Sequence, residues 1–323
     1  MKKILAMVLC LCMVAACFAG CNAEEGSQKA LKVGVIQYMS HPSLDNCYNG
    51  VAAALEASSL EVTIDRQIGS SNAAESDCIS YAKNMVAANY DMIVAIATPA
   101  AQAAFAAVED TDIPVIFCAV SDPVSAKLVD SMEKPGQNCT GTSDVLDLKA
   151  QLEMILAFQP EAKTIGILYT ASEENSLTNL KNFKDVCAAK GITVEASAVQ
   201  NASDIPAAAE ALAAKVDCIN NFTDNNVVNN LSVLLNAAEK YGIPVYGSEE
   251  EQVKNGCMAS VSINYVALGK VTGEMAAQVL GGADAGAMAV KTITDAELVY
   301  NSDVVSQLGL TLPAQYENAI NVK

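Results

Sequence analysis

From residue 31 onward, the chain repeats one pattern of hydrophobic and polar positions. Short, nearly continuous apolar runs such as MIVAIA and IPVIFCAV alternate with longer stretches in which apolar residues recur at helical spacing. Strands that are apolar on both faces are typical of parallel sheets that helices cover on both sides. The pattern therefore predicts an α/β fold in which strands and helices alternate.

The apolar runs fall into two series, which predict two doubly wound parallel-sheet lobes with a ligand cleft between them. The strands of the first series are expected at residues 31–38, 61–67, 92–97, 113–120 and 138–143. Those of the second series are expected at residues 163–170, 192–199, 216–222, 243–248 and 257–263. Helices are expected at Leu44–Ser58, Ala73–Asn89, Pro99–Glu109, Leu146–Phe158, Glu173–Lys190, Ile205–Lys215, Asn225–Tyr241 and Tyr265–Leu280.

The two lobes are expected to alternate along the chain. We assign residues 31–143 and about 265–290 to the N-terminal lobe, and residues 144–264 and about 291–323 to the C-terminal lobe. The helix after Asn264 contains glycines that allow close packing against a neighbouring element.

The N-terminus predicts a secreted protein. Lys2-Lys3 precedes an apolar stretch from Ile4 to Val14, which is too short to span a membrane as a stable helix. The sequence FAGC that ends at Cys21 resembles the bacterial lipobox, in which the cysteine is lipidated and becomes the mature N-terminus. We therefore expect a lipoprotein signal segment at residues 1–21, a polar tether at residues 22–30, and an extracytoplasmic protein anchored to the bacterial cell membrane. Ordinary secretion without lipidation is the alternative.

Amino-acid composition and net charge limit the classes of function that the chain can have. The chain has 323 residues, of which 52% are hydrophobic and 17% charged, so it can bury the cores of two domains. Its formal net charge of -18 leaves no basic footprint, which excludes a nucleic-acid partner.

The cysteines after the signal segment show no CxxC spacing, and several lie in apolar runs. We expect them to be small buried residues rather than zinc ligands. A single disulfide is the alternative, with Cys118 and Cys139 as the first candidate pair.

Catalytic signatures are missing. The sequence has one histidine, which cannot supply a histidine-based metal cluster, and no nucleophile–base motif occurs in a convincing context. We expect neither an enzyme nor a bound metal or cofactor.

Candidate binding groups follow the predicted strands, because parallel α/β sheets bind ligands outside the carboxyl ends of their strands. Helix N-termini with hydroxyl groups, as at Thr98, attract anions, and carboxylates at Asp122, Asp224 and Glu249 suit a cationic group. Each carboxylate has helix capping as its alternative role. Aromatic walls and one lone imidazole are expected from Tyr38, Phe222 and His41, each of which has a structural alternative.

At these strand ends the chain resembles the type I periplasmic-binding-protein fold, and more narrowly the substrate-binding lipoproteins of ABC transporters whose members include tryptophan and tyrosine binders. The matching segments include GVIQ…HPSLD, DMIVAIATPAAQAA, VSDPVSAKLV, NCTGTSD, ILYTASEENS and TDNNVV. The chain departs from the usual family pattern at Thr170-Ala171, where Asn-Pro is common, and at Glu249, where Asp is common. Carried over by position, the resemblance implies that the ligand faces Thr98, Ala100, Ser121, Asp122, Thr223, Asp224, Asn225, Ser248 and Glu249.

The resemblance implies a monomeric binding component of an ABC importer, which captures one small ligand by hinge closure and delivers it to permease subunits in the membrane. An amino acid is the favoured ligand, with aromatic ones first. A sugar or nucleoside on the same fold is the main alternative, although the absence of tryptophan disfavours sugars. A surface enzyme with Asp122 or Glu249 as acid/base is a third reading.

Overall fold

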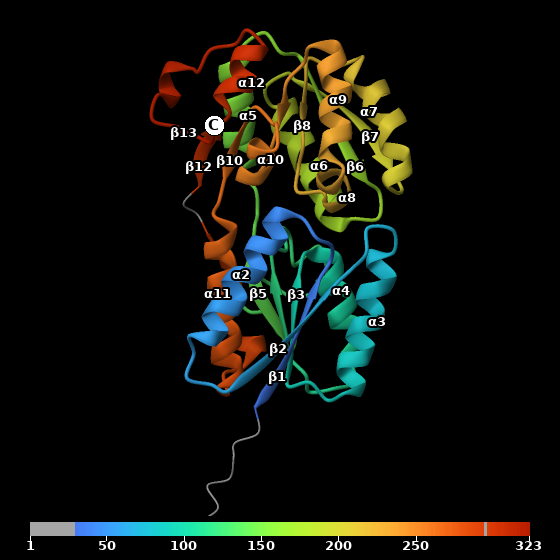
Figure 1. Cartoon of the computed structure of the whole chain (residues 1–323), viewed down its shortest axis with the longest axis vertical. Helices are drawn as coiled ribbons and strands as arrows, with labels where there is room; N and C mark the ends of the chain where they lie inside the picture. Colours follow the sequence, from blue (N-terminus) through green and yellow to red (C-terminus); the bar gives the residue numbers. More distant parts are fainter. Residues whose placement is uncertain (1–29, 294–295) are drawn as a thin grey trace, which may run out of the picture. The chain divides into compact units, whose positions relative to one another are not determined.

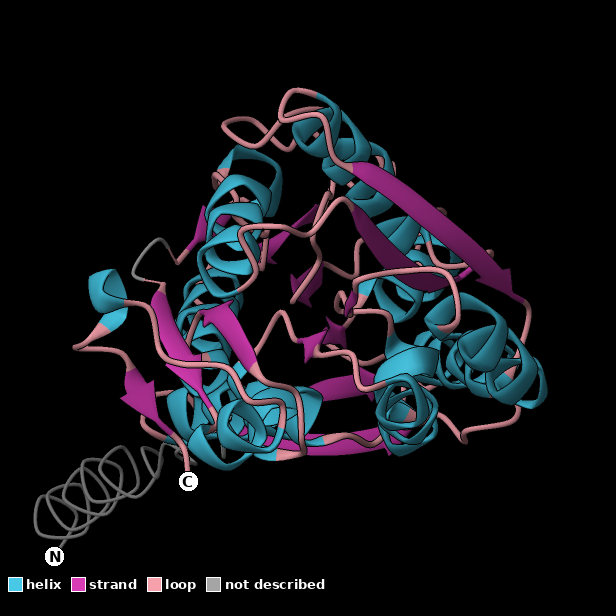
Figure 2. Cartoon of the chain, turned by 90° about the horizontal axis from the view of Figure 1, so that it is seen from above, coloured by secondary structure: helices cyan, strands magenta, loops and turns pink. Residues whose placement is uncertain are grey.

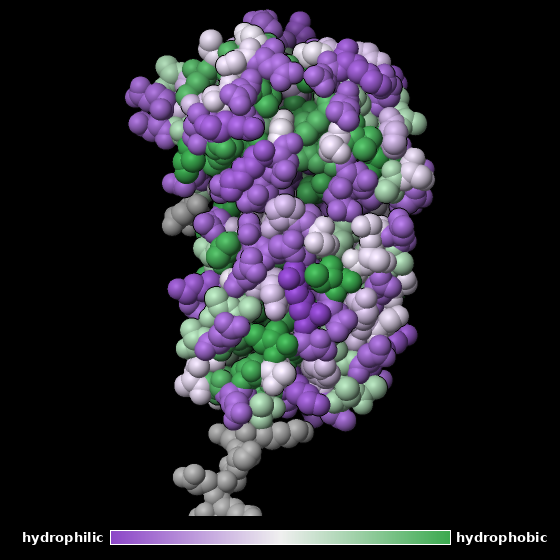
Figure 3. Space-filling model, viewed as in Figure 1, coloured by the Kyte–Doolittle hydropathy of each residue, from purple (hydrophilic) through white to green (hydrophobic). Residues whose placement is uncertain are grey.

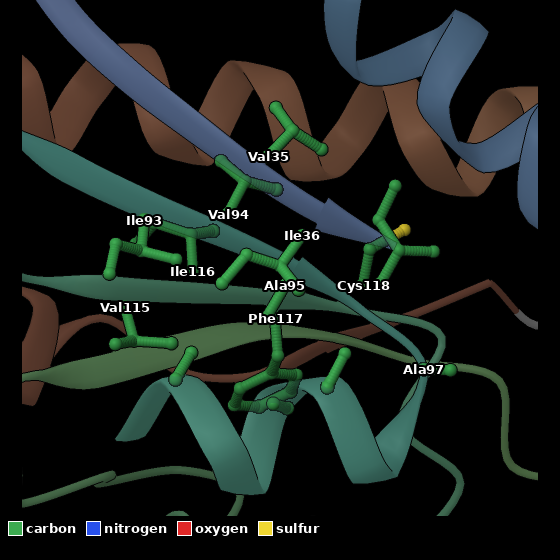
Figure 4. Close-up of a cluster of buried hydrophobic side chains, with 14 of the residues drawn as sticks. Val35, Ile36, Ile93, Val94, Ala95, Ala97, Val115, Ile116, Phe117 and Cys118 are labelled. Atoms are coloured by element: carbon green, nitrogen blue, oxygen red, sulfur yellow. The ribbon is translucent and has the colours of Figure 1, made fainter. Parts of the chain in front are cut away.

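The apolar runs of the first series form strands that are buried on both faces. In the computed structural model, which describes residues 30–293 and 296–323, every residue of β3 (Met92–Ile96) and β4 (Val115–Cys118) is buried. Figure 4 shows Val35 and Val94 on one side of these strands and Phe117 on the other. The strands are therefore covered from both sides, as their composition requires.

The first sheet is parallel throughout, with the order β11-β5-β4-β3-β1-β2. Helix α2 packs against α11, and α3 packs against α4 (Figure 1). The remaining elements of this lobe are β1 (Leu31–Gln37), β2 (Val62–Ile68), β5 (Cys139–Ser143), β11 (Lys291–Thr292), α2 (Pro42–Glu56), α3 (Ala74–Ala87), α4 (Thr98–Ala107) and α11 (Tyr265–Leu280).

The second sheet is also parallel, with the order β7-β6-β8-β9. It separates two hydrophobic clusters, one against α5 and α6 and the other against α7 and α9. Seen from above, helices lie around the central strands, and some strands lie at the rim (Figure 2). The elements are β6 (Thr164–Thr170), β7 (Thr193–Val199), β8 (Cys218–Asn220), β9 (Val245–Tyr246), α5 (Leu148–Phe158), α6 (Glu174–Ala188), α7 (Ile205–Ala213) and α9 (Leu231–Tyr241).

A third, small sheet was not expected. The last strand of the second series, β10 (Ala259–Ser262), does not join the parallel sheet but pairs antiparallel with β12 (Glu297–Tyr300), which pairs with β13 (Ile320–Asn321). The helix predicted at Asn225–Tyr241 is divided at Asn230 into α8 (Asn225–Asn229) and α9. Further short helices are α10 (Glu250–Lys254), α12 (Ser302–Gln307) and the 3₁₀ turns Ala202–Asp204, Ala285–Ala287 and Ala314–Tyr316.

The division of the chain into two lobes remains a proposal. The strand pairing near residue 291 differs from the expected lobe boundary. Strand β11 pairs with β5, so Lys291 and Thr292 belong to the first sheet and not to the C-terminal lobe. The signal segment, Cys21 and the tether up to residue 29 lie outside the described residues. Within residues 30–293 and 296–323, no helix is both long and apolar enough to cross a membrane.

The cysteines of the described residues are free and buried. The suggested Cys118–Cys139 disulfide is therefore wrong. The register of the first sheet explains the error, because Cys139 lies opposite Val115 at the other end of β4.

Apolar side chains on the surface are scattered. Val145 and Val124 are among the exposed large hydrophobic residues, at 55% and 42% exposure. On the face shown in Figure 3, apolar residues form separate groups among polar ones. Single exposed apolar residues are ordinary on protein surfaces and need no special function.

Both parallel sheets reverse their winding direction once. In the first sheet, β1 lies between β2 and β3, and in the second, β6 lies between β7 and β8. The chain therefore winds away in opposite directions from a point between β1 and β3, and from a point between β6 and β8. Such switch points leave a crevice at the carboxyl ends of the strands, which is where open α/β sheets bind ligands.

The α2–α11 contact yields a stability prediction. A Cβ atom at Gly269 would overlap the backbone carbonyl of Cys47, so the two helices approach closely only because this side chain is absent. We expect Gly269→Ala to lower the free energy of unfolding by about 1–3 kcal/mol, as overpacked cores do, even though alanine favours the helix. Urea denaturation of the ligand-free protein measures this.

Gly281→Ala at the end of the same helix is the control, because its φ of -78° suits alanine and its nearest neighbours lie at 3.3 Å. Equal stability of the two variants would contradict the close approach.

Candidate ligand-binding site

The carboxyl ends of the strands of both lobes border one narrow cavity, whose lining residues come from both lobes. The first lobe and the segments that leave it contribute His41, Ser43, Leu44, Ala97, Thr98, Ala119, Ser121, Asp144 and Tyr265. The second lobe contributes Asn175, Thr223, Asn225, Val228 and Glu249.

The first-lobe wall contains two alanines in unusual backbone conformations. Ala97 ends β3 with φ 82°, and Ala119 follows β4 with φ 56°, in a region that residues with a Cβ atom rarely adopt. Such conformations persist where the surrounding structure enforces them, and they concentrate at ligand sites. Both small side chains leave room for a ligand at the backbone.

Helix α4 begins at this wall. Its first helical hydrogen bond runs from Ala101 N to Ala97 O, so the backbone N–H groups of Thr98 and Ala100 have no acceptor within the helix. The hydroxyl of Thr98 is buried and also has no partner. Free donors at the positive end of a helix dipole form an anion site.

The second-lobe wall carries a buried carboxylate. Glu249 is 2% exposed, and neither of its carboxylate oxygens has a hydrogen-bond partner. Burial raises the pKa of Glu249 to about 8. A carboxylate in this position gains free energy from a cation or a strong donor that enters the cavity, because the nearby Gln252 side chain only partly offsets the effect of burial.

Other cavity residues also have buried polar atoms without partners. They are His41 Nδ1, Ser43 Oγ, Asn175 Oδ1 and Thr223 Oγ1. Buried polar atoms in folded proteins are nearly always hydrogen-bonded. Their concentration around one cavity indicates that the missing partner is a polar ligand.

Asp144 and Tyr265 lie on the two described segments that connect the lobes. Asp144 follows β5, and Tyr265 begins α11 after β10. The Tyr265 hydroxyl donates to Asp144 Oδ2 at 2.9 Å, and the Ser121 hydroxyl donates to Asp144 Oδ1 at 3.0 Å. Burial raises the pKa of Asp144. The hydrogen bonds join the connecting segments at the cavity.

Three hydrogen bonds between side chains link the lobes near the cavity. His41 Nε2 lies 3.3 Å from Asn225 Oδ1. Asn46 Nδ2 donates to Glu251 Oε1, and Asn229 Nδ2 donates to Ser71 Oγ, each also at 3.3 Å. Burial lowers the pKa of His41 to about 4, so the imidazole is neutral at pH 7.

Half of the twelve predicted site residues line the cavity, and they come from both lobes. Their role in ligand binding remains a prediction. They are His41, Thr98, Ser121, Thr223, Asn225 and Glu249.

The structure does not bring the other predicted carboxylates and the serine to the cavity, because each is engaged elsewhere. Asp224 accepts hydrogen bonds from Thr170 N and Oγ1, Ser176 Oγ and Val227 N, and thereby caps α8. Asp122 accepts from the backbone and hydroxyl of Ser125. The Ser248 hydroxyl donates to the carbonyl of Asn221. Helix capping, the alternative stated for these carboxylates, is what the structure shows for Asp224, whereas Asp122 stabilises a turn that is not part of a helix.

The predicted apolar and aromatic residues also lie outside the cavity. Ala100 is fully buried in the core of the first lobe. Phe222 packs edge-to-face on Phe183 with ring centroids 5.5 Å apart. Tyr38 borders a separate groove between the lobes, beside Ser71. None of the three forms part of the cavity lining.

Sequence reasoning missed cavity residues of two kinds. Asp144 directly follows β5, and Asn175 lies in the first turn of α6, shortly after β6, so extending the strand-end survey past the fourth strand and by a few residues would have included them. Tyr265, Ser43 and Leu44 lie within helices, and the positive φ of Ala97 leaves no sequence signal. Among the described residues, no three His, Cys, Asp or Glu side chains gather as a metal site.

Glu249 yields a stability prediction in the absence of ligand. Because its folded-state pKa of about 8 lies above the ordinary value of 4.5, the unfolding free energy falls as pH rises from about 4.5 to 8. Glu249→Gln removes this loss. We expect the stability gain of the variant over wild type to be larger at pH 8 than at pH 5 by at least about 1.4 kcal/mol, which corresponds to one pKa unit.

Chemical denaturation of ligand-free protein at both pH values measures the difference. Glu250→Gln, on the partly exposed first turn of α10, is the control. If the unfolding free energies of variant and wild type differed by the same amount at both pH values, ionisation of Glu249 would not cost stability in the folded protein.

Comparisons of this chain with known proteins agree on one protein family. The ABC transporter substrate binding protein family matches residues 32–320. The tyrosine-binding protein of Clostridioides difficile (strain R20291) is 34% identical over 337 residues, covering 100% of this chain and 95% of the relative. A structure from Streptococcus pneumoniae in complex with L-Trp is 36% identical with a TM-score of 0.86, covering 90% and 98% of the two chains.

A ligand-free, open structure of a substrate-binding protein with adhesive properties from Clostridium difficile is 36% identical with a TM-score of 0.68, covering 91% and 99%. These similarities confirm the type I periplasmic-binding-protein fold. The chain belongs to the family of ABC transporter substrate-binding proteins.

Proposed function

We propose that this protein captures one zwitterionic amino acid, an aromatic one by preference, for an ABC importer. The observation that carries the proposal is the unpartnered carboxylate of Glu249 in the same cavity as the free N-terminus of α4. An acidic group and an anion site on opposite lobes match the ammonium and carboxylate of an α-amino acid.

The cavity offers distinct groups to each part of such a ligand. Glu249 pairs with the ammonium group, and the backbone and hydroxyl of Thr98 bind the carboxylate. The apolar lining from Leu44, Val228 and Tyr265 accepts the side chain. One relative of this chain is a tyrosine-binding protein, and a similar solved structure contains L-Trp. Both support an aromatic side chain on the ligand.

A sugar is the weaker candidate. A neutral polyol would offer Glu249 no countercharge, so its binding would gain nothing from the ion pair that an ammonium group forms with this carboxylate. A solved binding protein with bound myo-inositol is 16% identical to this chain, so its similarity supports the fold alone.

Ligand capture is coupled to closure of the lobes. A ligand shifts a conformational equilibrium only by its difference in affinity for the two states. A zwitterion held by Glu249 from one lobe and Thr98 from the other binds the closed state better than the open state. The closed protein then docks on permease subunits, and no chemical step is required of it.

Lipidation at Cys21 belongs to the same proposal. Acyl chains tether a protein to a membrane with about 0.8 kcal/mol per buried CH₂ group. We propose that the protein acts as an anchored monomer outside the cytoplasm.

Ligand specificity is tested by calorimetry against the standard L-amino acids. We expect L-tyrosine or L-tryptophan to bind with micromolar Kd or better, which corresponds to about -8 kcal/mol. 3-(4-Hydroxyphenyl)propionate, which is tyrosine without its ammonium group, is expected to bind at least tenfold more weakly than tyrosine. Myo-inositol and glucose serve as controls, and tighter binding of either sugar than of any amino acid would overturn the proposal.

The pH dependence of binding tests the role of Glu249. Because the pKa of Glu249 is about 8, the ligand-free site is mostly protonated at pH 6, and pairing with an ammonium releases that proton. Affinity should therefore rise with pH between 6 and 8, by up to about tenfold per pH unit.

Calorimetry in buffers of different ionisation enthalpy counts the released proton. Glu249→Gln should bind at least tenfold more weakly at pH 8 and lose most of the pH dependence. A wild-type affinity that is constant from pH 6 to 8 would exclude Glu249 as the ammonium partner.

A further inference from the structure

The network behind the cavity is organised by a second buried carboxylate, that of Glu173, which does not itself line the cavity. Glu173 is 1% exposed and immediately precedes α6. Its Oε2 accepts hydrogen bonds from Asn225 Nδ2 at 2.6 Å, Asn225 N at 3.0 Å and Asn175 Nδ2 at 3.2 Å. Its Oε1 accepts from Asn226 N at 3.1 Å.

A carboxylate that accepts these bonds determines the orientation of each amide. Burial and the neighbouring Asp224 raise the pKa of Glu173 to about 8. Above that pH the carboxylate is ionised and has no proton to donate, so each asparagine must direct its NH₂ group towards Glu173. Asn175 is held in the same sense by the carbonyl of Thr223, which accepts from its Nδ2 at 3.1 Å. The carbonyl oxygens Oδ1 of Asn175 and Asn225 consequently point away from Glu173.

The orientation of Asn225 also determines the tautomer of His41. Asn225 Oδ1 only accepts hydrogen bonds, and it lies 3.3 Å from His41 Nε2. The neutral imidazole therefore carries its proton on Nε2. Its Nδ1, which is buried and unpartnered in the cavity wall, presents a lone pair.

Several hydrogen-bond acceptors in the cavity wall therefore have no donor of the chain as a partner. Asn175 Oδ1, His41 Nδ1 and both oxygens of Glu249 are buried, have no partner and belong to residues that line the same cavity. We propose that Glu173 is a positioning residue, which fixes Asn175, Asn225 and His41 so that the cavity presents acceptors to the ammonium group of the ligand. This inference rests on the proposed function, because it assigns the remaining donors of the ligand ammonium beyond the one paired with Glu249.

A primary ammonium group has three N–H donors and no acceptor, so it is the group that such a wall selects. A carboxylate of a ligand would meet unfavourable lone pairs there, and a hydroxyl could donate to only one of the acceptors. A site built for a hydrogen-bonding group discriminates strongly against analogues that lack it, because its buried polar atoms are then left unpaired.

The single histidine allows a direct test that needs no ligand. Nitrogen-15 NMR of the histidine-labelled, tag-free protein reports His41 alone, and an unprotonated ring nitrogen resonates well downfield of a protonated one. Above pH 8, where Glu173 is ionised, we expect the ligand-free wild type to show Nε2 protonated and Nδ1 unprotonated. A wild-type spectrum with Nδ1 protonated overturns the inference, whether or not any variant folds.

Glu173→Met removes the acceptor while keeping side-chain length, and it frees the Asn225 amide to turn. We expect the His41 ring signals to shift towards the other tautomer or towards a mixture. Glu174→Met is the matched control, because this neighbour is only partly buried and has no hydrogen bond to either asparagine. Glu173→Gln, whose amide oxygen still accepts, should keep more of the wild-type signal than Glu173→Met.

Binding provides the second measurement. In Glu173→Met, the preference for L-tyrosine over 3-(4-hydroxyphenyl)propionate should fall at least tenfold, with the control unchanged. Damage to the cavity alone would weaken both ligands equally, and this outcome, or an unchanged His41 tautomer, overturns the inference. If the wild type binds no amino acid, the proposed function fails, and the NMR experiment alone then decides the role of Glu173.

Discussion

The site depends on the cost of burying negative charge without a positive charge from the same chain. Of the described residues that line the cavity, none is a lysine or arginine, and the neutral His41 adds no charge. The one arginine in the sequence, Arg66, lies instead over the Tyr48 ring at 3.9 Å and bonds Asp45 at the start of α2. The cavity therefore favours a ligand that carries a positive charge, because no residue of its lining supplies one.

Four buried acids lie in or next to this cavity, and the different ways in which they are stabilised separate ligand-binding from supporting roles. Asp144 accepts hydrogen bonds from the Tyr265 and Ser121 hydroxyls. Asp224 accepts from backbone and hydroxyl groups, and Glu173 accepts from asparagine amides and backbone N–H groups. These three are satisfied without a ligand. No hydrogen bond of good geometry reaches Glu249, and the nearby Gln252 only partly offsets the effect of burial on its pKa, so Glu249 gains most when a ligand donor enters. Burial alone does not mark a binding residue, whereas burial without a partner does.

The sequence predicts the fold better than the site, for physical reasons. The central strands are apolar on both faces, and this property is local, so the order of strands and helices was predicted almost throughout. The pairing of β10 with β12 depends on residues far apart in the chain and was missed. Strand ends identified Thr98 and Glu249 because both follow the carboxyl ends of parallel strands, β3 and β9. Whether Asp122 and Asp224 stabilise the turn or helix that follows them or face a ligand depends on hydrogen bonds that the residue type does not determine.

The side-chain hydrogen bonds between the two lobes hold them together only weakly. The side-chain hydrogen bonds that link them are long, at 3.3 Å, and none joins a pair of opposite charges. Such bonds contribute little net free energy because water offers equivalent partners in the open state. A state that is only weakly favoured by its own contacts is easily shifted, because a ligand that contacts both walls adds its differential affinity directly to the equilibrium. The unpaired acceptors and the free helix N-terminus thus serve closure as much as affinity, since each wall supplies the partner for one end of the same molecule.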